Sequence, residues 1–413
     1  MQEPPDALQQ NIWKYYAFHI FLNLQLWFPI WIIYLTEERG LTLAQVTLID
    51  VPFWLSIILL QIPAAAIADR WGRKPTLIGA ALAFSSAVVF FGLASSFWLL
   101  LGSYLVWGVG FSLLYGTESA FIYDSLKAMG REEEYTHVYG RGWALATGAQ
   151  LAGTLIGAPL AGATNLIFPV LLSGGIASLA VLVALTFREP RAVSATHHPS
   201  YGEIIRDSVQ VLRRQPAVRY AILFYGLITL GSVAPVFFFQ PFLRDHGVDI
   251  GEVGIWQTPM RILGILAALG AYRIMRTLGE RGAFYMMPLV LVPSYVLLAS
   301  WDSAYAQISF STINFVVILS QPTVTGYVNR RVPSEQRATV LSMTNLIRSM
   351  VLIPTAPLMG ILAEEISLEA SFAVAAGAVA ILGLPLMAAW LPHLSRRSDT
   401  LPTESVAAPL PAD

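Results

Sequence analysis

The chain has 413 residues, of which 55% are hydrophobic and 12% are charged, and its net charge is −1. A soluble protein of this length carries about twice that charged fraction, so much of the surface of this chain must face lipid. The charge balance argues against nucleic acid as a partner, and the absence of cysteine excludes disulfides and thiolate chemistry. The six histidines show no metal-ligand spacing, so we expect no metal and no cofactor.

Twelve apolar runs are long enough to cross a bilayer, which takes about 20 helical residues. A polar tail over 1–13 precedes them and lacks the basic start of a signal peptide. The runs fall at 14–36, 44–67, 75–95, 98–126, 138–163 and 166–187, and then at 218–242, 251–275, 283–300, 304–327, 338–362 and 369–391. We therefore predict an all-α membrane protein with two six-helix bundles, 14–187 and 218–391.

Lysine and arginine are distributed unevenly between the predicted loops. If the N-terminus is cytoplasmic, the cytoplasmic loops and tails hold 21 of these 25 residues. The opposite face holds only Arg39 and Arg244, while Arg261 and Arg348 fall inside spans. Basic residues concentrate in cytoplasmic loops, so this asymmetry places both termini in the cytoplasm.

The segment 188–217 between the two sets of spans is polar. Ser200 and Glu203 have the spacing of a capping box, and apolar residues recur behind them at helical intervals. This pattern favours an amphipathic helix lying on the membrane surface, with a plain linker turn as the alternative. The tail over 392–413 is rich in proline, serine and alanine, which favours disorder.

The loop after the second span reads A-A-I-A-D-R-W-G-R-K over residues 65–74. It resembles the G-x-L-A-D-R-x-G-R-K/R motif of the major facilitator superfamily, whose members are secondary transporters. The matching residues are Asp69, Arg70, Gly72, Arg73 and Lys74, while Ala65 replaces the first glycine of the motif. The resemblance implies a monomer with two pseudo-symmetric halves.

In that family the motif forms a charge network that latches the two halves together on the cytoplasmic side. The resemblance implies that Asp69 and Arg73 take those parts here. Asp124, near the inner end of the fourth span, and Arg141, at the start of the fifth, are expected to join them. A static structural clamp is the alternative to a moving latch.

Three further segments bear on this resemblance. The pattern Arg276-x-x-Gly279-x-Arg281, between spans eight and nine, looks like a worn second copy of the motif. Gln61 stands where one bacterial branch of the family has an acid, in E-I-P-T-G. The run A-P-L-A-G-A over 158–163 resembles the G-P-x-x-G-G of antiporters, with alanine at two of the glycine positions. The antiporter-like run implies a drug- or solute–proton antiporter in a bacterial inner membrane. Gln61 implies that, if the acid carries protons in relatives, this protein carries them elsewhere or not at all.

Ionisable groups inside spans are costly unless paired, so each is a functional candidate. Glu118 and Asp50 are the proton-coupling candidates, because an acid in apolar surroundings can take up a proton near neutrality. For Glu118 a fixed structural pair is the alternative, and for Asp50 a surface position.

Arg261 and Arg348 stay charged and must meet an anion, which is either the substrate or an acid such as Glu118 or Asp50. Other polar groups suggest a cavity between the halves, although helix–helix hydrogen bonds are the commoner role of such residues. These cavity candidates are His19, Asn23, Gln25, Gln240, Gln257, Asn314, Gln321 and Asn345.

The leading functional hypothesis is a carrier of a small organic solute that works by alternating access and is driven by the proton gradient, with export favoured over uptake of an anionic metabolite. Facilitated transport without protons remains open. A non-transporting sensor or a lipid scramblase on the same fold is the alternative of another class. The chain shows no triad order and no phosphate loop, which argues against an enzyme and against a nucleotide partner.

Overall fold

The computed structural model describes residues 5–190, residues 202, 206 and 210, and residues 212–394 apart from 333. It gives no side-chain environment for 5–7, 334–342 or 345. Most of the predicted linker helix, the tail beyond Leu394 and the side chain of Asn345 therefore lie outside the described residues.

The N-terminal half consists of helices with short breaks inside some of its spans. Its elements are α1 (Pro5–Asn23), η1 (Phe28–Ile30), α2 (Trp31–Ile33), η2 (Tyr34–Glu38), α3 (Leu43–Ile49), α4 (Val51–Trp71), α5 (Arg73–Leu93), α6 (Phe97–Leu114), α7 (Thr117–Ala128), η3 (Glu132–Glu134), α8 (Tyr135–Ala163) and α9 (Ile167–Leu185). Span one is thus interrupted between Asn23 and Phe28, and span four is interrupted at Gly116, whose φ is 84°. Neither break was predicted.

The C-terminal half has the same character. Its elements are α11 (Pro216–Leu230), η4 (Ala234–Phe238), α12 (Phe239–Asp245), η5 (Ile250–Glu252), α13 (Val253–Ser300), η6 (Ala304–Gln307), α14 (Ile308–Asn329), α15 (Ser334–Glu365), α16 (Leu368–Trp390) and η7 (Leu391–His393). Helix α13 is really two helices that meet at Gly279, where φ is 68° and ψ is 177°.

The predicted twelve spans are consistent with this structure. The described residues contain eleven stretches long and apolar enough to cross a membrane, and one of them runs 51 residues from Ile250 to Ser300. A straight helix of that length would measure about 75 Å, far more than the ~30 Å hydrocarbon core. The kink at Gly279 divides it into spans eight and nine, which brings the count to twelve.

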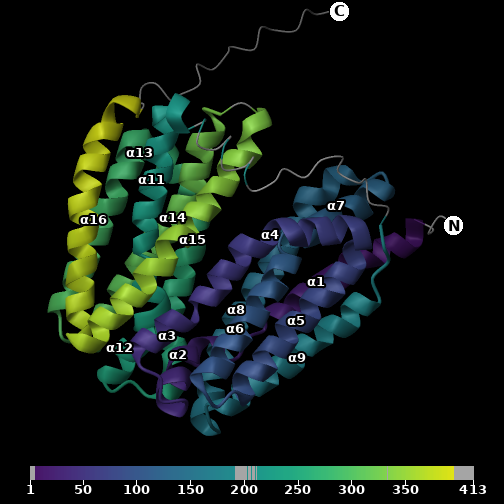
Figure 1. Ribbon diagram of the computed structural model, residues 1–413, viewed down its shortest axis with the longest axis horizontal. Helices are drawn as coiled ribbons and strands as arrows, with labels where there is room; N and C mark the ends of the chain where they lie inside the picture. The colour runs from purple at the N-terminus through teal and green to yellow at the C-terminus, as the bar shows by residue number, and fades with distance from the viewer. Residues whose placement is uncertain are drawn as a thin grey trace, which may run out of the picture.

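The helices form two groups that diverge toward one end of the molecule (Figure 1). Helices α11 to α16 stand on one side and α1 to α9 on the other, and the groups approach each other near α2, α3 and α12. We call the diverging side the basic end. The helix junctions that carry Arg73, Arg188, Arg281 and Arg331 alternate along the chain with the junctions at the other end, and so belong to this side.

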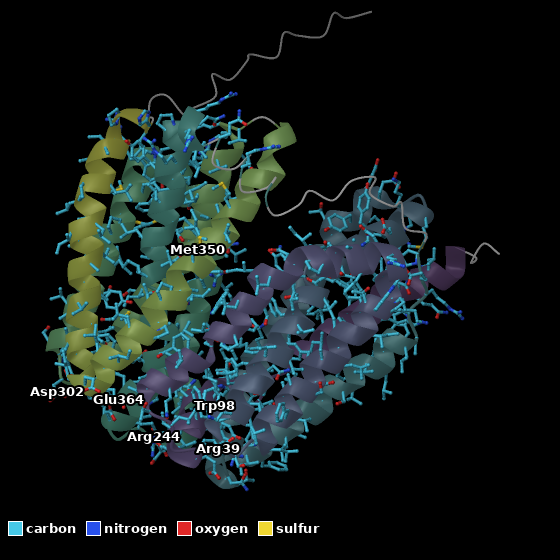
Figure 2. The ribbon with its side chains drawn as sticks, viewed as in Figure 1. Arg39, Trp98, Arg244, Asp302, Met350 and Glu364 are labelled. Atoms are coloured by element: carbon cyan, nitrogen blue, oxygen red, sulfur yellow. The ribbon has the colours of Figure 1, made fainter. Side chains whose placement is uncertain are left out.

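The other end, which we call the opposite end, carries the residues predicted for the non-cytoplasmic loops. Arg39, Arg244, Asp302 and Glu364 all lie there (Figure 2). This grouping agrees with the loop assignment made from the lysine and arginine distribution.

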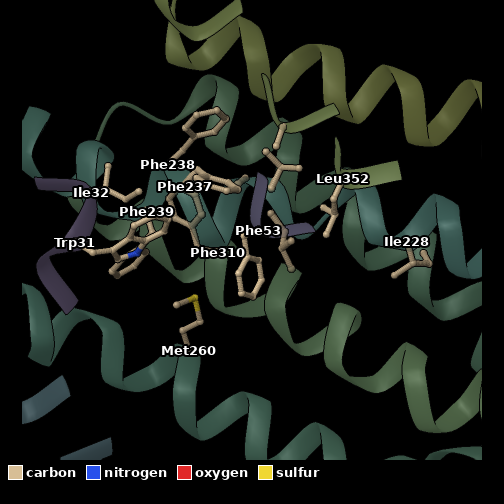
Figure 3. Close-up of a cluster of buried hydrophobic side chains, with 14 of the residues drawn as sticks. Trp31, Ile32, Phe53, Ile228, Phe237, Phe238, Phe239, Met260, Phe310 and Leu352 are labelled. Atoms are coloured by element: carbon tan, nitrogen blue, oxygen red, sulfur yellow. The ribbon is translucent and has the colours of Figure 1, made fainter. Parts of the chain in front are cut away.

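Apolar packing joins the two halves near the opposite end. Figure 3 shows Trp31, Ile32 and Phe53 of the N-terminal half in one buried cluster with Phe237, Phe310 and other residues of the C-terminal half. The rings of Trp31 and Phe237 are 5.6 Å apart between centroids. Two residues of this cluster, Trp31 and Phe53, also line cavities inside the molecule.

Candidate functional site

Two adjoining cavities lie between the halves, with volumes of about 250 and 480 Å³. Both are bounded by Phe28, Gln150 and Arg261, so these three side chains stand where the cavities meet. Helices from both halves contribute to the larger cavity, through α8 on one side and α13 and α14 on the other. Sites of small-molecule ligands commonly have volumes of ~300–1,000 Å³.

The walls are mostly aromatic. The rings that line one or both cavities are Trp27, Phe28, Trp31, Phe53, Phe84, Trp107, Phe111 and Trp143. Trp27 lies in the break of span one and Phe28 begins η1, and both rings line the smaller cavity. Indole and phenyl faces in such a wall suit a flat apolar ligand.

Arg261 is the one charged group among the described residues that line the two cavities. Its guanidinium lies over the Phe28 ring, 4.9 Å from the ring centre. Its Nε is buried and donates to no other group in the described part of the chain. The predicted pairing of Arg261 with Glu118 or Asp50 is therefore absent from this structure, since both acids have other neighbours.

Gln150 is a cavity residue that sequence reasoning missed. Its Nε2 donates to Asn23 Oδ1 at 2.9 Å, and Asn23 Nδ2 donates in turn to the His19 carbonyl oxygen at 2.8 Å. Gln150 lies in α8, inside the predicted span 138–163. A polar residue inside an apolar span was the available signal.

His19 and Glu118 face each other instead of lining the cavities. His19 Nε2 is 3.1 Å from Glu118 Oε2, and both side chains are buried. The two atoms are close enough for an ion pair, although they are not aligned as a hydrogen bond, and neither atom has a hydrogen-bond partner among the described residues. The Tyr15 ring packs edge-on against His19 with centroids 4.4 Å apart.

Local backbone explains why a carboxylate is tolerated at position 118. The break at Gly116 starts a new helix at Thr117, so Glu118 lies in the first turn of α7. Free backbone amides and the helix dipole stabilise a negative charge at that place. The apolar surroundings expected for Glu118 are thus modified by a helix N-terminus and by His19.

Asp50 and Arg348 form a second polar group near the interface of the halves. Trp54 Nε1 donates to Asp50 Oδ2 at 2.6 Å, and the Arg348 guanidinium lies 5.4 Å from the centre of the Trp54 ring. Asp50 lies between α3 and α4, where it is the C-cap residue of α3 and the N-cap residue of α4. Neither Asp50 nor Arg348 lines the two cavities.

The remaining cavity candidates divide into three groups. Gln257 and Asn314 line the larger cavity, and Gln25 lines the smaller. Gln240 does not, because its amide accepts from the Ile32 backbone at 2.9 Å and donates to the Phe28 carbonyl at 3.1 Å. It satisfies backbone groups that the break in span one leaves unpaired. Gln321 is exposed and also lies outside both cavities.

The loop motif forms a compact charge network at the basic end. Arg73 Nη1 is 2.6 Å from Asp69 Oδ1, and Arg73 Nε is 3.5 Å from Asp124 Oδ2. Gly72 adopts a φ of 104°, which a residue with a side chain rarely takes, and so allows α4 to turn into α5. Glu189, which the sequence did not single out, accepts from the backbone amides of Arg73 and Lys74 at 2.6 and 2.7 Å.

Two of the expected motif residues take no visible part in that network. Arg70 and Arg141 are exposed, and within the described chain no salt bridge joins Arg141 to Asp69, Arg73 or Asp124. Within the described part of the chain, the ion pairs and the backbone hydrogen bond of Arg73 go to Asp69, Asp124 and Glu189, which all precede the C-terminal half.

The C-terminal half repeats this arrangement with the charges reversed. A constant offset of 207 residues relates Gly72 to Gly279, Arg73 to Glu280 and Asp124 to Arg331. Glu280 is buried, and its Oε2 lies 2.8 Å from Arg331 Nη2. The segment Arg276 to Arg281 is therefore a structural counterpart of the motif at residues 65–74, although it has the acid Glu280 at the position of Arg73.

At the opposite end the two halves are in direct contact. Arg244 Nε is 2.7 Å from Glu37 Oε1, and the Ala44 amide donates to Glu364 Oε2 at 3.2 Å. Gly360 of α15 packs against α3 so closely that an added Cβ would lie 2.1 Å from Thr47 Oγ1. The molecule is thus closed at this end and has its halves diverging at the basic end (Figure 1).

These features define a polytopic helical membrane protein with two six-span halves and a cavity between them. The family model of the Major Facilitator Superfamily matches residues 16–354, so the chain belongs to that superfamily. A relative from Bacillus subtilis (strain 168), described as the uncharacterized MFS-type transporter YxaM, is 22% identical over 380 residues, covering 86% of this chain and 89% of its own.

Solved structures show the same fold at low sequence identity. The nucleoside transporter NupG superposes with a TM-score of 0.78 at 14% identity, covering 93% of this chain and 99% of that one. A bacterial homolog of the human lysosomal transporter Spinster, in an inward-facing and occupied conformation, gives 0.71 at 17% identity, covering 97% and 98% of the two chains. Membership in the superfamily makes this chain a membrane transporter of a small molecule.

Proposed function

We propose that this protein is a proton-coupled carrier that moves a small organic solute by alternating access, with export as its direction. The observation that carries the proposal is the buried contact between His19 and Glu118 beside a central cavity. The antiporter-like run over 158–163 supports export.

The His19–Glu118 pair suits a proton carrier. With one proton shared between imidazole and carboxylate the pair is neutral overall, and with two protons it carries one positive charge. A buried net charge is costly, so the affinity for the second proton depends on how much water reaches the pair. A conformational change that opens or closes this space therefore changes the occupancy of the proton site.

Two hydrogen bonds connect the cavity to the backbone of His19. Asn23 binds the carbonyl oxygen of His19, and Gln150 binds Asn23 while facing both cavities. A solute that displaces or binds Gln150 shifts the turn of α1 that holds His19. This route supplies a physical link between solute and proton.

The basic end is proposed to face the cytoplasm of a bacterial inner membrane, because the lysines and arginines of the loops gather there. The described conformation is then inward-facing, closed by Glu37–Arg244 and by the α3–α15 contact. Arg73 is proposed to contact the C-terminal half only after the transporter turns outward. We also propose that the protein works as a monomer, with the proton gradient as its energy source and without a cofactor.

The test is solute-dependent proton movement in liposomes that contain the full chain and a pH-sensitive dye. Cationic drugs, organic anions and sugars are added in turn to wild type, to Glu118→Gln and to Glu133→Gln. Glu133 is an exposed acid in η3, so its amide variant is a matched control. We expect one solute class to move protons in wild type and in the control, and Glu118→Gln to abolish this.

Other results would redirect the assignment. Labelled solutes that equilibrate without proton movement would make the protein a facilitated carrier, and the coupling proposal would fail. If protons and solute move across the membrane in the same direction, the protein would be an uptake system. Movement of labelled lipid without movement of any solute would favour a scramblase.

A further inference from the structure

We infer that the central cavities bind an aromatic organic anion, with its carboxylate or similar acid group on Arg261 and its ring between the aromatic walls. The inference rests on the proposed carrier function and names the substrate class of the same site. It is carried by the positions of Arg261, Gln257 and the surrounding rings.

The charge balance of the cavities calls for an anion. Arginine stays protonated in proteins, and a guanidinium removed from water needs a counter-charge. No acid is among the described residues that line either cavity. The nearby acids are engaged elsewhere, Glu118 with His19 and Asp50 with Trp54. An incoming anion therefore finds an unopposed positive charge at the point where the two cavities meet.

The geometry of Arg261 favours a flat acid group. One face of its guanidinium is covered by the Phe28 ring, 4.9 Å away, which leaves the edge with the N–H groups free. Its buried Nε has no acceptor among the described residues. A carboxylate can accept two parallel bonds from such an edge, and this fork-to-fork contact is among the stronger polar contacts in proteins.

A second unsatisfied atom specifies the ligand further. Gln257 precedes Arg261 by one helical turn on α13 and lines the larger cavity, and its Oε1 is buried without a donor from the described chain. A carbonyl oxygen there accepts a bond from an O–H or N–H group of the ligand. The ligand thus carries an acid at one position and a hydrogen-bond donor at another.

The aromatic walls select a flat ring over a flexible chain. Trp27 and Phe28 line the smaller cavity, and Phe28, Trp31 and Trp143 line the larger one. Offset or edge-to-face contacts with such rings contribute beyond simple burial. A sugar would meet few of the polar groups that it needs, and an organic cation would be repelled by Arg261.

The test compares matched ligands by isothermal titration calorimetry on the purified full-length protein. The probes are a hydroxynaphthoate, the corresponding hydroxynaphthamide, and the naphthoate without its hydroxyl. We expect the hydroxynaphthoate to bind best. Replacing its carboxylate by the neutral amide should weaken binding roughly 30-fold or more, because Arg261 then lacks its counter-charge.

Variants of the protein test the same contacts by changing the side chains that bind the ligand. Arg261→Ala should weaken hydroxynaphthoate binding to a similar extent and remove the preference for acid over amide. Arg261→Lys should keep part of that preference. Gln257→Leu should remove the difference between the ligands with and without the hydroxyl. Arg273→Ala, an exposed arginine on the same helix, should bind as wild type does.

The inference is overturned if the amide binds as tightly as the acid, if no probe binds to folded wild type, or if Arg261→Ala leaves the acid preference intact. The comparison of the acid with the amide needs only the wild-type protein, so it tests the inference even if a variant does not fold. Binding that follows Arg261 without solute-dependent proton movement would preserve the inference while the coupling proposal fails. If only cations move with protons, the coupling proposal would stand and the inference of an anionic ligand would fail.

Discussion

Adding a side chain at Gly360 should push the carrier out of the conformation described here. Gly360 lies in α15, and a Cβ built on it would lie 2.1 Å from Thr47 Oγ1 and 2.9 Å from the Leu43 carbonyl oxygen. Ordinary contact begins near 3.4 Å, so the halves would have to separate by about 1 Å there. Thr47 cannot easily turn away, because its hydroxyl donates to the carbonyls of Leu43 and Ala44.

The expected size of this effect follows from the cost of overpacking. Extra carbon atoms in a well-packed interface cost about 1–3 kcal/mol. The contact exists only while the opposite end is closed, so the whole cost falls on this state. A difference of that size changes the ratio of two conformations by about 5- to 150-fold. Gly360→Ala should give the smaller shift and Gly360→Val the larger.

Double electron–electron resonance can measure the shift, and the chain has no native cysteine to remove. One spin-label pair at Ala163 and Glu365 reports the opposite end, and another at Glu133 and Thr277 reports the basic end, since all four positions are exposed. In Gly360→Val we expect longer distances for the first pair and shorter distances for the second.

The control is Gly377→Ala in α16, where an added Cβ meets nothing within 4 Å. Its distance distributions should match those of the unsubstituted labelled protein. The reasoning is refuted if Gly360→Val gives the same distributions as this control in protein that remains folded. It would then be clear that the α3–α15 contact does not hold the opposite end closed.

Three further outcomes are expected at the motif and the cavity. Arg73→Ala removes the cation that contacts the Asp69 and Asp124 carboxylates, so the midpoint of thermal unfolding in detergent should fall. Because these side chains are only partly buried, the loss should lie between about 1 kcal/mol, as for an exposed pair, and about 3 kcal/mol, as for a buried one. An unchanged midpoint would contradict this. Glu280→Arg should lower the midpoint of thermal unfolding. Adding Arg331→Asp should recover part of it, because the N-terminal half already has an arginine and an aspartate at the corresponding positions 73 and 124. If nothing is recovered, the two pairs are not equivalent. Gln150→Leu should raise the solute KM about 5-fold, the cost of about one hydrogen bond, with an unchanged unfolding midpoint; a lowered midpoint with unchanged KM would make Gln150 structural.

Much of the architecture follows from the sequence because lipid imposes simple constraints. Apolar runs of fixed length predicted twelve spans, and the resemblance of residues 65–74 to a family motif predicted the family. The helical membrane fold and the family are confirmed. The breaks inside spans were not predictable in the same way. The segment from Asn23 to Phe28 lies within a run that is apolar enough on average to span a membrane, and the break in it is stabilised by Gln240 from the other half. The local sequence pattern cannot show that Gln240, far away in the chain, contacts this segment.

The candidate site shows the same division. Single residues such as Arg261 and Glu118 could be selected, because any ionisable group inside a span is costly. Their partners could not, since the contact between His19 and Glu118 depends on the packing of α1 against α7. Gln240 and Arg348 were grouped with the cavity residues by type alone, and the structure places them at helix contacts instead.

The most direct test of the central claim is solute accumulation against a concentration gradient in liposomes with an imposed pH difference. The account predicts that wild type concentrates its solute only while the pH difference lasts. It also predicts that Glu118→Gln still exchanges labelled for unlabelled solute but no longer accumulates it. Wild-type protein that merely equilibrates the solute at every imposed pH difference, or a Glu118→Gln variant that accumulates it normally, would contradict proton coupling through the His19–Glu118 pair.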